Sequence, residues 1–394
     1  MKSDSSVTGF RVIIVVIVLC LTLPGILTRL HIIDGSHGME ALMFGIGLLG
    51  AAFMLSWAAE VAQMDISQGF ALAILAFIAV LPEYAVDMVF AWKAGSDPSY
   101  APLALANMTG ANRLLIGLGW PMVLLIFFIK TRKKSLQMIK SHGTEIFYLM
   151  CATAYAFTIP FKKSLNLIDA VVLVAIFVVY LIRTAKAEVE EPELVGPASM
   201  IGALETGWRR MVVAFLFLYS GAIIFLSAEP FAESLVAFGR DAGLDEFLLV
   251  QWLAPLASEA PEFMVAAIWA SRGQVQSALG ALISSKVNQW TLLVGTLPIV
   301  YSISIGAMTA LPLDMRQDHE IWLTAGQSIF AVAILSNLRI SWYGAVLLAV
   351  LFLAQLIVSE IRIEVFFIYL VFAFLILIRD RKHLPGLIKT GLKF

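Results

Sequence analysis

Two glutamates that follow prolines inside apolar segments are the clearest candidates for chemistry in this sequence. Glu83 follows Pro82, and Glu262 follows Pro261 in a second apolar stretch. A proline within a helix donates no backbone hydrogen bond, so a carbonyl oxygen about one turn earlier lacks its usual donor. Carboxylate and carbonyl oxygens are the ligands that hard cations such as Ca²⁺ prefer. The two Pro-Glu pairs therefore predict a cation site at interrupted helices.

Further carboxylates lie close to these pairs along the chain. Asp87 follows Glu83 by four residues, which places both on one helix face, and Glu259 precedes Glu262 by three. A charge at the centre of a bilayer costs ~2.5–3.5 kcal/mol on insertion scales, so the four carboxylates together cost on the order of 10 kcal/mol. A purely structural explanation, a kinked helix with a snorkelling or protonated acid, must account for that cost twice. A functional cation site accounts for the buried carboxylates at both Pro-Glu pairs.

The elements that position these residues are expected to be membrane-spanning helices. Of the 394 residues, 60% are apolar and 14% are charged, against roughly 45–50% and about 25% in soluble domains. The formal net charge of −1 excludes a basic nucleic-acid-binding protein. Apolar runs lie at 10–29, 38–63, 68–93, 101–130, 143–160, 165–184, 211–238, 245–271, 275–305, 319–337, 340–358 and 362–379. Runs of this length are too long for barrel strands of ~10 residues, so we expect an all-α polytopic membrane protein with about 12 transmembrane helices.

The distribution of lysine and arginine predicts the orientation in the membrane. The loop after the fourth run, the central linker and the C-terminal tail contain most of them: Arg132, Lys133, Lys134, Lys140, Lys186, Arg209, Arg210, Arg379, Arg381, Lys382, Lys389 and Lys393. The opposite loops carry fewer, among them Arg362 and the pair Lys162-Lys163, which is the one discordant feature. By the positive-inside rule, we expect both termini and the linker to be cytoplasmic, in a plasma (inner) membrane.

The sequence around the first Pro-Glu pair recurs around the second. Pro82-Glu83 matches Pro261-Glu262, and residues 104–107 (Ala-Leu-Ala-Asn) match 278–281 (Ala-Leu-Gly-Ala). The blocks lie on the third and fourth runs and on the eighth and ninth, so an odd number of spans separates them and the halves are inverted. Inverted repeats with interrupted helices are typical of secondary transporters. The expected divisions are an extra helix in 1–37, five-helix repeats in 38–184 and 211–358, a linker in 185–210, and an extra helix with a basic tail in 359–394.

These blocks resemble the two α-repeats of the sodium/calcium exchanger superfamily, the calcium/cation antiporters. The family repeats read roughly Gly-Thr-Ser-x-Pro-Glu, followed by Ala-Leu-Gly-Asn/Asp-x-x-Gly-Ser-Asn. Here residues 79–83 read Ala-Val-Leu-Pro-Glu and 104–112 read Ala-Leu-Ala-Asn-Met-Thr-Gly-Ala-Asn. In the second block, 258–262 read Ser-Glu-Ala-Pro-Glu and 278–286 read Ala-Leu-Gly-Ala-Leu-Ile-Ser-Ser-Lys. The resemblance covers about residues 38–358.

The resemblance implies a set of cation ligands. Glu83 and Glu262 correspond to the central metal-binding glutamates of the family, Asn107 to its amide ligand and Ser277 to a hydroxyl ligand. Ser258 and Glu259 occupy the positions of two hydroxyl residues in the second repeat.

Departures from the family pattern leave the coupling ion open. Ala79 and Val80 replace hydroxyl residues, Ala281 replaces an amide or carboxylate, and Lys286 lies where an Asn is expected. Lys286 and Arg113 either form structural ion pairs or snorkel to a helix end, or Lys286 occupies the space of one cation, which would reduce sodium binding and favour protons.

Asp87 is a third candidate for proton coupling or charge compensation, and two interpretations of it stay open. It forms a close carboxylate pair with Glu83, which suits proton coupling, or it pairs with Arg113.

The expected function is therefore secondary cation antiport, with Ca²⁺ exchanged for Na⁺ or H⁺ by alternating access at a midplane site. The alternatives are a Na⁺/H⁺ or other cation/proton exchanger of the same superfamily and, less favoured, a cation channel. The sequence has no His-Glu-x-x-His motif, so no enzyme activity is expected. We expect no cofactor, with Ca²⁺, Na⁺ or H⁺ as transported ions, and no nucleic-acid partner or obligatory protein partner beyond the lipid bilayer.

Overall fold

The computed structural model describes residues 2–65, 80–185 and 194–392, with side chains from Arg11 onward. The chain forms two compact units. The first unit comprises Met1–Val89 and Glu188–Glu262, and the second comprises Phe90–Ala187 and Phe263–Phe394. The described residues do not include parts of the third apolar run or residues 186–193 of the predicted linker. They also exclude Ala79, one of the departures from the family pattern.

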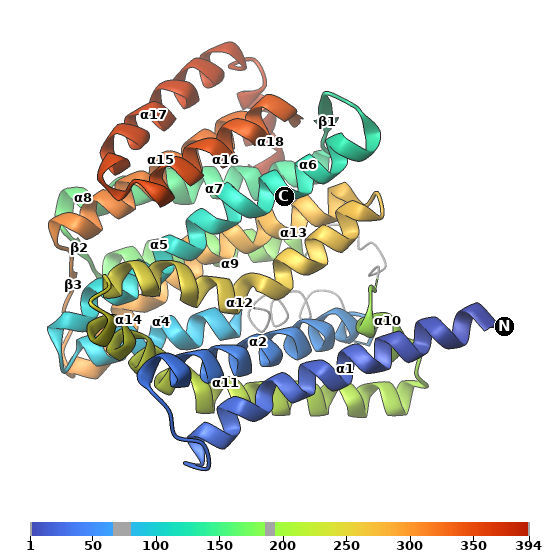
Figure 1. Cartoon of the computed structure of the whole chain (residues 1–394). Helices are drawn as coiled ribbons and strands as arrows, with labels where there is room; N and C mark the ends of the chain where they lie inside the picture. The colour runs from blue at the N-terminus through green and yellow to red at the C-terminus, as the bar shows by residue number, and fades with distance from the viewer. Residues whose placement is uncertain (1, 66–79, 186–193, 393–394) are drawn as a thin grey trace. The chain divides into compact units, whose positions relative to one another are not determined.

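In the first unit, α2 packs between α1 and α11 (Figure 1). Its helices are α1 (Lys2–Arg29), α2 (His37–Ala62), the start of α4 (Leu81–Ala94), α10 (Pro197–Gly202), α11 (Thr206–Ala242) and most of α12 (Glu246–Ser271). Met54 and Trp57 of α2 contribute to a buried apolar cluster with Ile201 of α10 and Leu216 of α11. Small residues permit the close helix approach that membrane packing needs, and a side chain at Gly50 would lie 2.9 Å from the Val18 carbonyl of α1.

An ion pair joins the end of α2 to the start of α11. Arg209 donates hydrogen bonds of 2.7 and 2.8 Å to the carboxylate of Asp65. These bonds lower the pKa of the Asp65 carboxyl. The pair therefore stabilises the unit above the ordinary pKa of an aspartate, and this contribution is lost as the pH falls through the lowered pKa.

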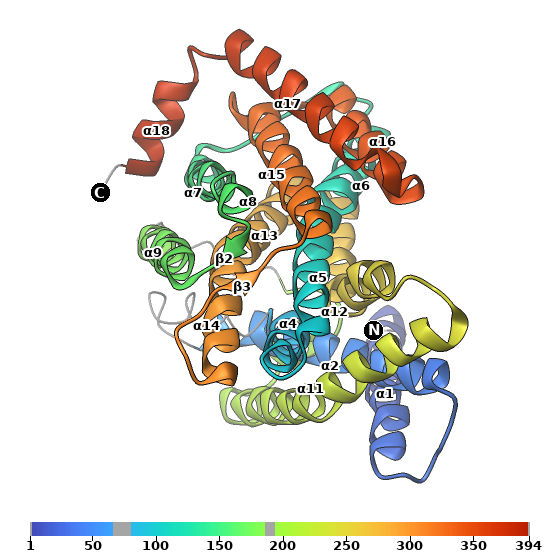
Figure 2. The same ribbon diagram turned by 90° about the vertical axis from the view of Figure 1, so that its left-hand side faces the viewer.

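In the second unit, α15 packs against α17, α5 and α7 (Figure 2). The helices and turns are η1 (Pro98–Tyr100), α5 (Ala101–Leu114), η2 (Leu115–Gly119), α6 (Trp120–Thr131), η3 (Lys140–His142), α7 (Gly143–Ala156), α8 (Ile159–Lys162), α9 (Leu167–Thr184), α13 (Val275–Asn288), η4 (Gln289–Leu293), α14 (Val294–Ile305), α15 (Met315–Leu335), α16 (Trp342–Ile357), η5 (Ser359–Ile361), α17 (Arg362–Arg379) and α18 (Leu384–Leu392). Side-chain capping boxes fix the starts of α9, at Asn166, and α15, at Asp314.

Two compound helices of the second unit have the same construction. Each consists of 14 α-helical residues, a π-helical turn of 5 and a further α-helix of 12. The second begins 174 positions after the first (101 to 275), and its π turn follows with the same spacing (115 to 289). π turns are rare and often mark functional sites. The sequence match at 104–107 and 278–281 therefore lies within a longer structural match.

Two short antiparallel strand pairs join loops of the second unit. β1 (Ser135–Gln137) pairs with β4 (Arg339–Ser341), with Leu136 opposite Ile340. β2 (Ser164–Leu165) pairs with β3 (Leu311–Pro312), with Leu165 opposite Leu311. Each pair ties a loop between helices to a loop more than a hundred residues away.

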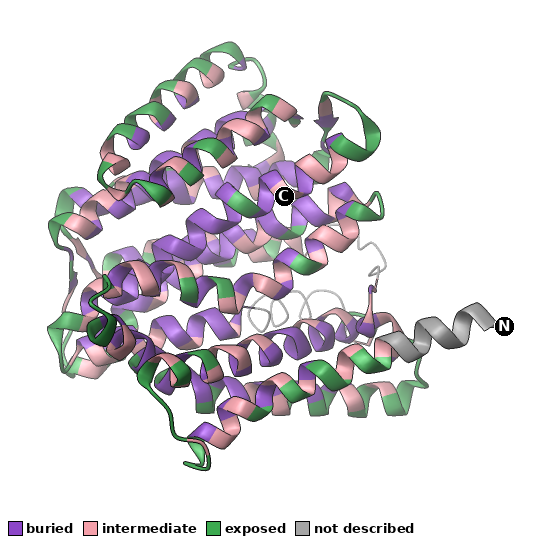
Figure 3. Ribbon diagram, viewed as in Figure 1, coloured by how far each residue is buried: buried purple, intermediate pink, exposed green. Residues whose placement is uncertain are grey.

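The described chain is predominantly helical, and the expected all-α membrane class is confirmed at that level. Among the described residues, six helices are long and apolar enough to cross a membrane: Arg11–Arg29, His37–Ala62, Pro98–Thr131, Leu167–Thr184, Thr206–Ala242 and Ser359–Arg379. Figure 3 shows exposed residues along α1 and α17, whereas α2 is mostly buried. The number of twelve spans stays a prediction.

Two charges that the sequence places in loops form ion pairs with buried carboxylates. Lys162 pairs with Asp169, whose side chain is fully buried. Arg362 lies 2.7 Å from Glu320, and only 13% of its side chain is exposed. The sequence counts both residues among the loop charges of one side but does not give their carboxylate partners, which depend on how the helices pack.

The π turn of the first compound helix requires a glycine. A Cβ at Gly117 would overlap the ring of Phe352 in α16. We expect Gly117→Ala to lower the free energy of unfolding by about 1–3 kcal/mol, the usual cost of overpacking a filled interior. Gly221→Ala in α11, where nothing lies within 4 Å of the added atom, is the control. Thermal unfolding in detergent measures both, and equal melting temperatures would contradict the assigned contact.

Candidate functional site

Glu83 and Asp87 are buried one turn apart on α4. Glu83 is the third residue of the helix and is 3% exposed, and Asp87 is fully buried. Their spacing of four residues puts both carboxylates on the same helix face, as the sequence predicted. Pro82 lies in the first turn of α4, where a proline is tolerated because the first helical N–H groups have no partner within the helix.

The second Pro-Glu pair lies inside a continuous helix. α12 contains Pro255 and Pro261 and runs through both. Pro261 has no N–H to donate to the carbonyl of residue 257, and the Ser258 hydroxyl donates to the Ala254 and Pro255 carbonyls at 3.3 and 3.2 Å. The break in hydrogen bonding is therefore local and does not divide the helix.

Three predicted ligands lie within four residues of one another on this part of α12. Glu259 is 2% exposed, while Ser258 and Glu262 are half-buried. Ser258 and Glu262 are four residues apart and share a face. The carboxylates that the sequence singles out, Glu83, Asp87, Glu259 and Glu262, all belong to the first unit.

The predicted amide and hydroxyl ligands belong to the second unit. Asn107 is 1% exposed in the middle of α5, and Ser277 is half-buried in the first turn of α13. Asn107 ends the block 104–107 of the first compound helix, and Ser277 directly precedes the block 278–281 of the second. The oxygen ligands of the second unit are thus neutral, whereas those of the first unit are mainly anionic.

Lys286 is fully buried and is held by the opposite compound helix. Its ammonium donates to the Asn112 side-chain oxygen at 2.6 Å and to the Asn112 main-chain oxygen at 3.2 Å. It also lies 4.4 Å from the centre of the Trp290 ring, close enough for a cation–π interaction. Two oxygens and an aromatic face thus surround a tethered monovalent cation.

The contact joins equivalent positions of the two compound helices, because Asn112 and Lys286 are also 174 residues apart. The sequence identified Lys286 as a departure from the family pattern but did not predict Asn112 as its partner. No local sequence signal gives that pairing, since it depends on how the two helices cross.

Arg113 forms a buried ion pair with Glu320 of α15. Its Nη1 also donates to the Gln355 side chain of α16 at 2.8 Å. Of the interpretations left open for this arginine, the contact with Glu320 agrees with a structural ion pair. Sequence reasoning missed Glu320 and Gln355, although both are polar residues inside apolar runs, which is the same signal that identified Glu83.

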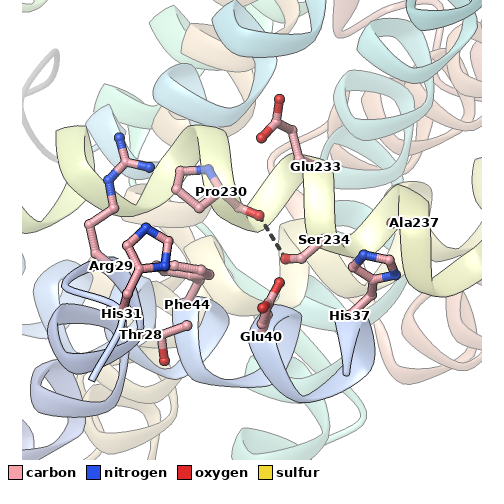
Figure 4. A pocket seen from close by; sticks show the side chains of 10 residues that line it. All are labelled: Thr28, Arg29, His31, His37, Glu40, Phe44, Pro230, Glu233, Ser234 and Ala237. Atoms are coloured by element: carbon pink, nitrogen blue, oxygen red, sulfur yellow. Dashed lines mark hydrogen bonds between the residues drawn. The ribbon is translucent and has the colours of Figure 1, made fainter. Parts of the chain in front are cut away.

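A cavity of about 290 Å³ opens in the first unit, among the ends of α1, α2 and α11. Figure 4 shows Glu40 of α2 rising toward Ser234 of α11, whose hydroxyl donates to the Pro230 carbonyl at 2.6 Å. Glu233 and His37 also line the cavity. Mixed carboxylate, hydroxyl and imidazole groups make this opening polar at the end of otherwise apolar helices.

Within the described residues, no three His, Cys, Asp or Glu side chains form a metal-ligating cluster. The predicted ligand set is of another kind, because it combines glutamates from two helices with amide and hydroxyl oxygens. This set suits a hard cation that binds oxygen and exchanges rapidly.

Comparisons with known proteins place the chain among cation exchangers. The sequence profile described as sodium/calcium exchanger protein matches residues 39–185 and 212–360. The crystal structure of the H⁺/Ca²⁺ exchanger CAX is similar over 97% of both chains, with 46% identity and a TM-score of 0.92. YfkE, at 15% identity, shares the fold with a TM-score of 0.63 over 86% of this chain and 98% of its own.

Two further relatives extend the comparison. The sodium-calcium exchanger NCX_Mj, at 18% identity, has a TM-score of 0.54 over 82% of this chain and 98% of its own. A protein of Alkalimonas amylolytica named CaxA is 26% identical over 100 residues, which are 25% of this chain. That match spans 31% of the length of CaxA.

The Lys286–Asn112 contact predicts a measurable coupling. We expect Asn112→Leu to lower the free energy of unfolding by about 1.5–3 kcal/mol, because a buried ammonium loses its charge-assisted hydrogen bond. In the double variant with Lys286→Met, much of this loss should disappear, since no charge remains to be satisfied. Denaturant or thermal unfolding of the four proteins gives the coupling energy, and strictly additive losses would contradict the contact.

Proposed function

The chain belongs to the sodium/calcium exchanger protein family, and from this premise we propose that it is a secondary antiporter that exchanges Ca²⁺ for protons. The family match covers most of the chain, and the similarity to the H⁺/Ca²⁺ exchanger CAX extends over 97% of its length. Both support calcium as the transported ion, and the similarity to CAX supports protons as the coupling ion.

The observation that carries the choice of protons is the environment of Lys286. Its ammonium takes the Asn112 side-chain oxygen and a main-chain oxygen, which are groups that a bound sodium ion would otherwise use. A tethered cation in this place reduces the number of sites open to monovalent ions. Carboxylates can bind either Ca²⁺ or protons, so a site rich in glutamate couples the two by competition.

We propose that Glu83 and Glu262 are the central cation ligands, with Asn107, Ser277, Ser258 and Glu259 contributing oxygens. In the proposed cycle, Ca²⁺ binds dehydrated at these carboxylates and the protein then opens to the opposite side of the membrane. Protons compete for the same carboxylates and displace the cation. Asp87, one turn from Glu83, is a candidate carrier of a second proton. Because one set of ligands serves both ions, neither crosses without exchange.

The proposed architecture comprises two inverted five-helix repeats, 38–184 and 211–358, joined by a linker and flanked by one helix at each end. The equal construction of the two compound helices, 174 residues apart, supports the repeat. Lys162 pairs with Asp169 at the start of α9, but the positive-inside rule counts lysine and arginine rather than net charge, so the pair Lys162-Lys163 stays the one discordant feature. The larger number of lysines and arginines in the linker, the loop after the fourth run and the C-terminal tail supports cytoplasmic termini, in a plasma membrane.

The proposed ligands predict loss of transport without loss of fold. We expect Glu83→Gln and Glu262→Gln each to reduce ⁴⁵Ca²⁺ uptake into proteoliposomes by more than about 100-fold, beyond the ~10–100-fold typical of outer-shell changes. The amide keeps the size of the side chain but removes the charge that binds the cation. Glu205→Gln, at the exposed start of α11, should transport normally. Uptake retained in both site variants would refute the ligand assignment.

Lys286 predicts a change in ion coupling. We expect Lys286→Asn to make Ca²⁺ uptake sensitive to Na⁺, because the variant frees the oxygens of Asn112 for a monovalent cation. The wild type should respond to pH and not to Na⁺, and Lys133→Asn in an exposed loop should resemble it. Uptake measured against Na⁺ concentration and pH tests this, and unchanged ion stoichiometry and pH dependence in Lys286→Asn would overturn it.

A further inference from the structure

Three charged side chains form a buried cluster on helices α5, α15 and α17 of the second unit. Arg113, Glu320 and Arg362 have side chains that are 1%, 0% and 13% exposed. The Glu320 carboxylate contacts the Arg113 guanidinium, and its Oε1 lies 2.7 Å from Nε of Arg362. One carboxylate therefore joins α5, in the first third of the sequence, to the helix that the sequence predicted as an extra C-terminal element.

Neighbouring contacts fix Arg113 in a single orientation. Its Nη1 donates to Gln355 of α16 at 2.8 Å, and its Nε donates to the Thr109 carbonyl at 3.3 Å. Its own carbonyl accepts from Gln327 of α15 at 3.4 Å. Both the side chain and the backbone of α5 are thus held at this residue, two positions before the π turn begins at Leu115.

The helix held in this way carries two amides that matter for the proposed site. Asn107 lies six residues before Arg113, and Asn112 directly precedes it and binds Lys286. A rotation or shift of α5 would move both amides together, because a helix is stiff over this length.

We propose that Glu320 is a positioning residue for transport, which acts through Arg113 to fix α5, and that Arg362 makes α17 part of the transport machinery. The inference rests on the proposed function for its transport readout. Close packing of α15 on α17 agrees with it, since a side chain at Gly326 would lie 2.7 Å from the ring of Phe366.

Replacing the charged side chains can distinguish a role in positioning α5 from a role in stabilising the fold. Replacing an entire buried charge cluster with apolar residues of similar size is often neutral for stability, whereas removing one partner leaves an uncompensated charge. An apolar replacement of all three residues therefore tests whether the directed contacts themselves are needed. Loss of an outer contact to a metal ligand typically changes affinity about 10- to 100-fold.

The experiment compares Glu320→Gln, the triple variant R113M/E320M/R362M, and Glu364→Gln on an exposed position of α17 as a control. For each variant we measure the Ca²⁺ concentration at half-saturation and the maximal rate of ⁴⁵Ca²⁺ uptake. The melting temperature and the hydrogen exchange of the α5 amides are measured as well. We expect half-saturation to rise about 10- to 100-fold in Glu320→Gln and in the triple variant, with faster exchange in α5. The triple variant should melt close to the wild type, and Glu364→Gln should be unchanged in every readout.

A second pair of variants probes the contribution of α17 with a smaller disturbance. Arg362→Gln should raise half-saturation, and Arg362→Lys should restore it in part, because lysine keeps the charge beside Glu320. A triple variant with wild-type half-saturation and wild-type α5 exchange would show that the cluster is only structural, and would overturn the proposal.

The two proposals fail in distinguishable ways. If the wild type exchanged no Ca²⁺, the proposed function would fall, while hydrogen exchange in α5 would still decide whether Glu320 positions that helix. Unchanged α5 exchange in Glu320→Gln would overturn the positioning role, whatever ion the protein transports.

Discussion

Charge inside an apolar bundle must be satisfied by partners that the fold supplies, and this constraint organises the second unit. Water is absent from the hydrocarbon region, so a buried cation needs a carboxylate, an amide oxygen or an aromatic face close by. Glu320 serves Arg113 and Arg362, Asp169 serves Lys162, and Asn112 with Trp290 serves Lys286. The contacts with Glu320, Asp169 and Asn112 each cross between helices, so satisfying the charge also fixes how those helices pack.

The chemistry divides between the two units. The first unit contributes the buried carboxylates of α4 and α12, whereas the second contributes amides, hydroxyls and tethered cations. In the proposed mechanism, carboxylates bind Ca²⁺ or protons, and the cations of the second unit limit the room for further monovalent ions. Lys286 illustrates how a repeat acquires this asymmetry, since the equivalent position in the other compound helix is Asn112 and the two side chains bind each other.

The helical class and the bounds of most described helices could be predicted from hydropathy, because it is a local property of the sequence. The partners of buried charges could not. Arg362 and Lys162 were assigned to loops because they lie at the ends of apolar runs, and only the packing of α17 on α15 and the fold of α8 onto α9 bring them beside carboxylates. Glu320 carried the same signal as Glu83, a charge in an apolar run, but without a proline or a repeat to mark it. The sequence shows that burying such a charged residue costs free energy. The role of the residue depends on how the helices cross, which the sequence does not show.

The central claim is that protons, not sodium ions, drive calcium exchange at the glutamate site. It is tested most directly by ⁴⁵Ca²⁺ uptake into proteoliposomes that hold the wild-type protein, under an imposed pH gradient and, separately, under an imposed Na⁺ gradient at equal pH. The account predicts uptake that follows the pH gradient and collapses with a proton ionophore, and none above the protein-free control under the Na⁺ gradient. Uptake driven by Na⁺ at equal pH, with no response to the pH gradient, would contradict it.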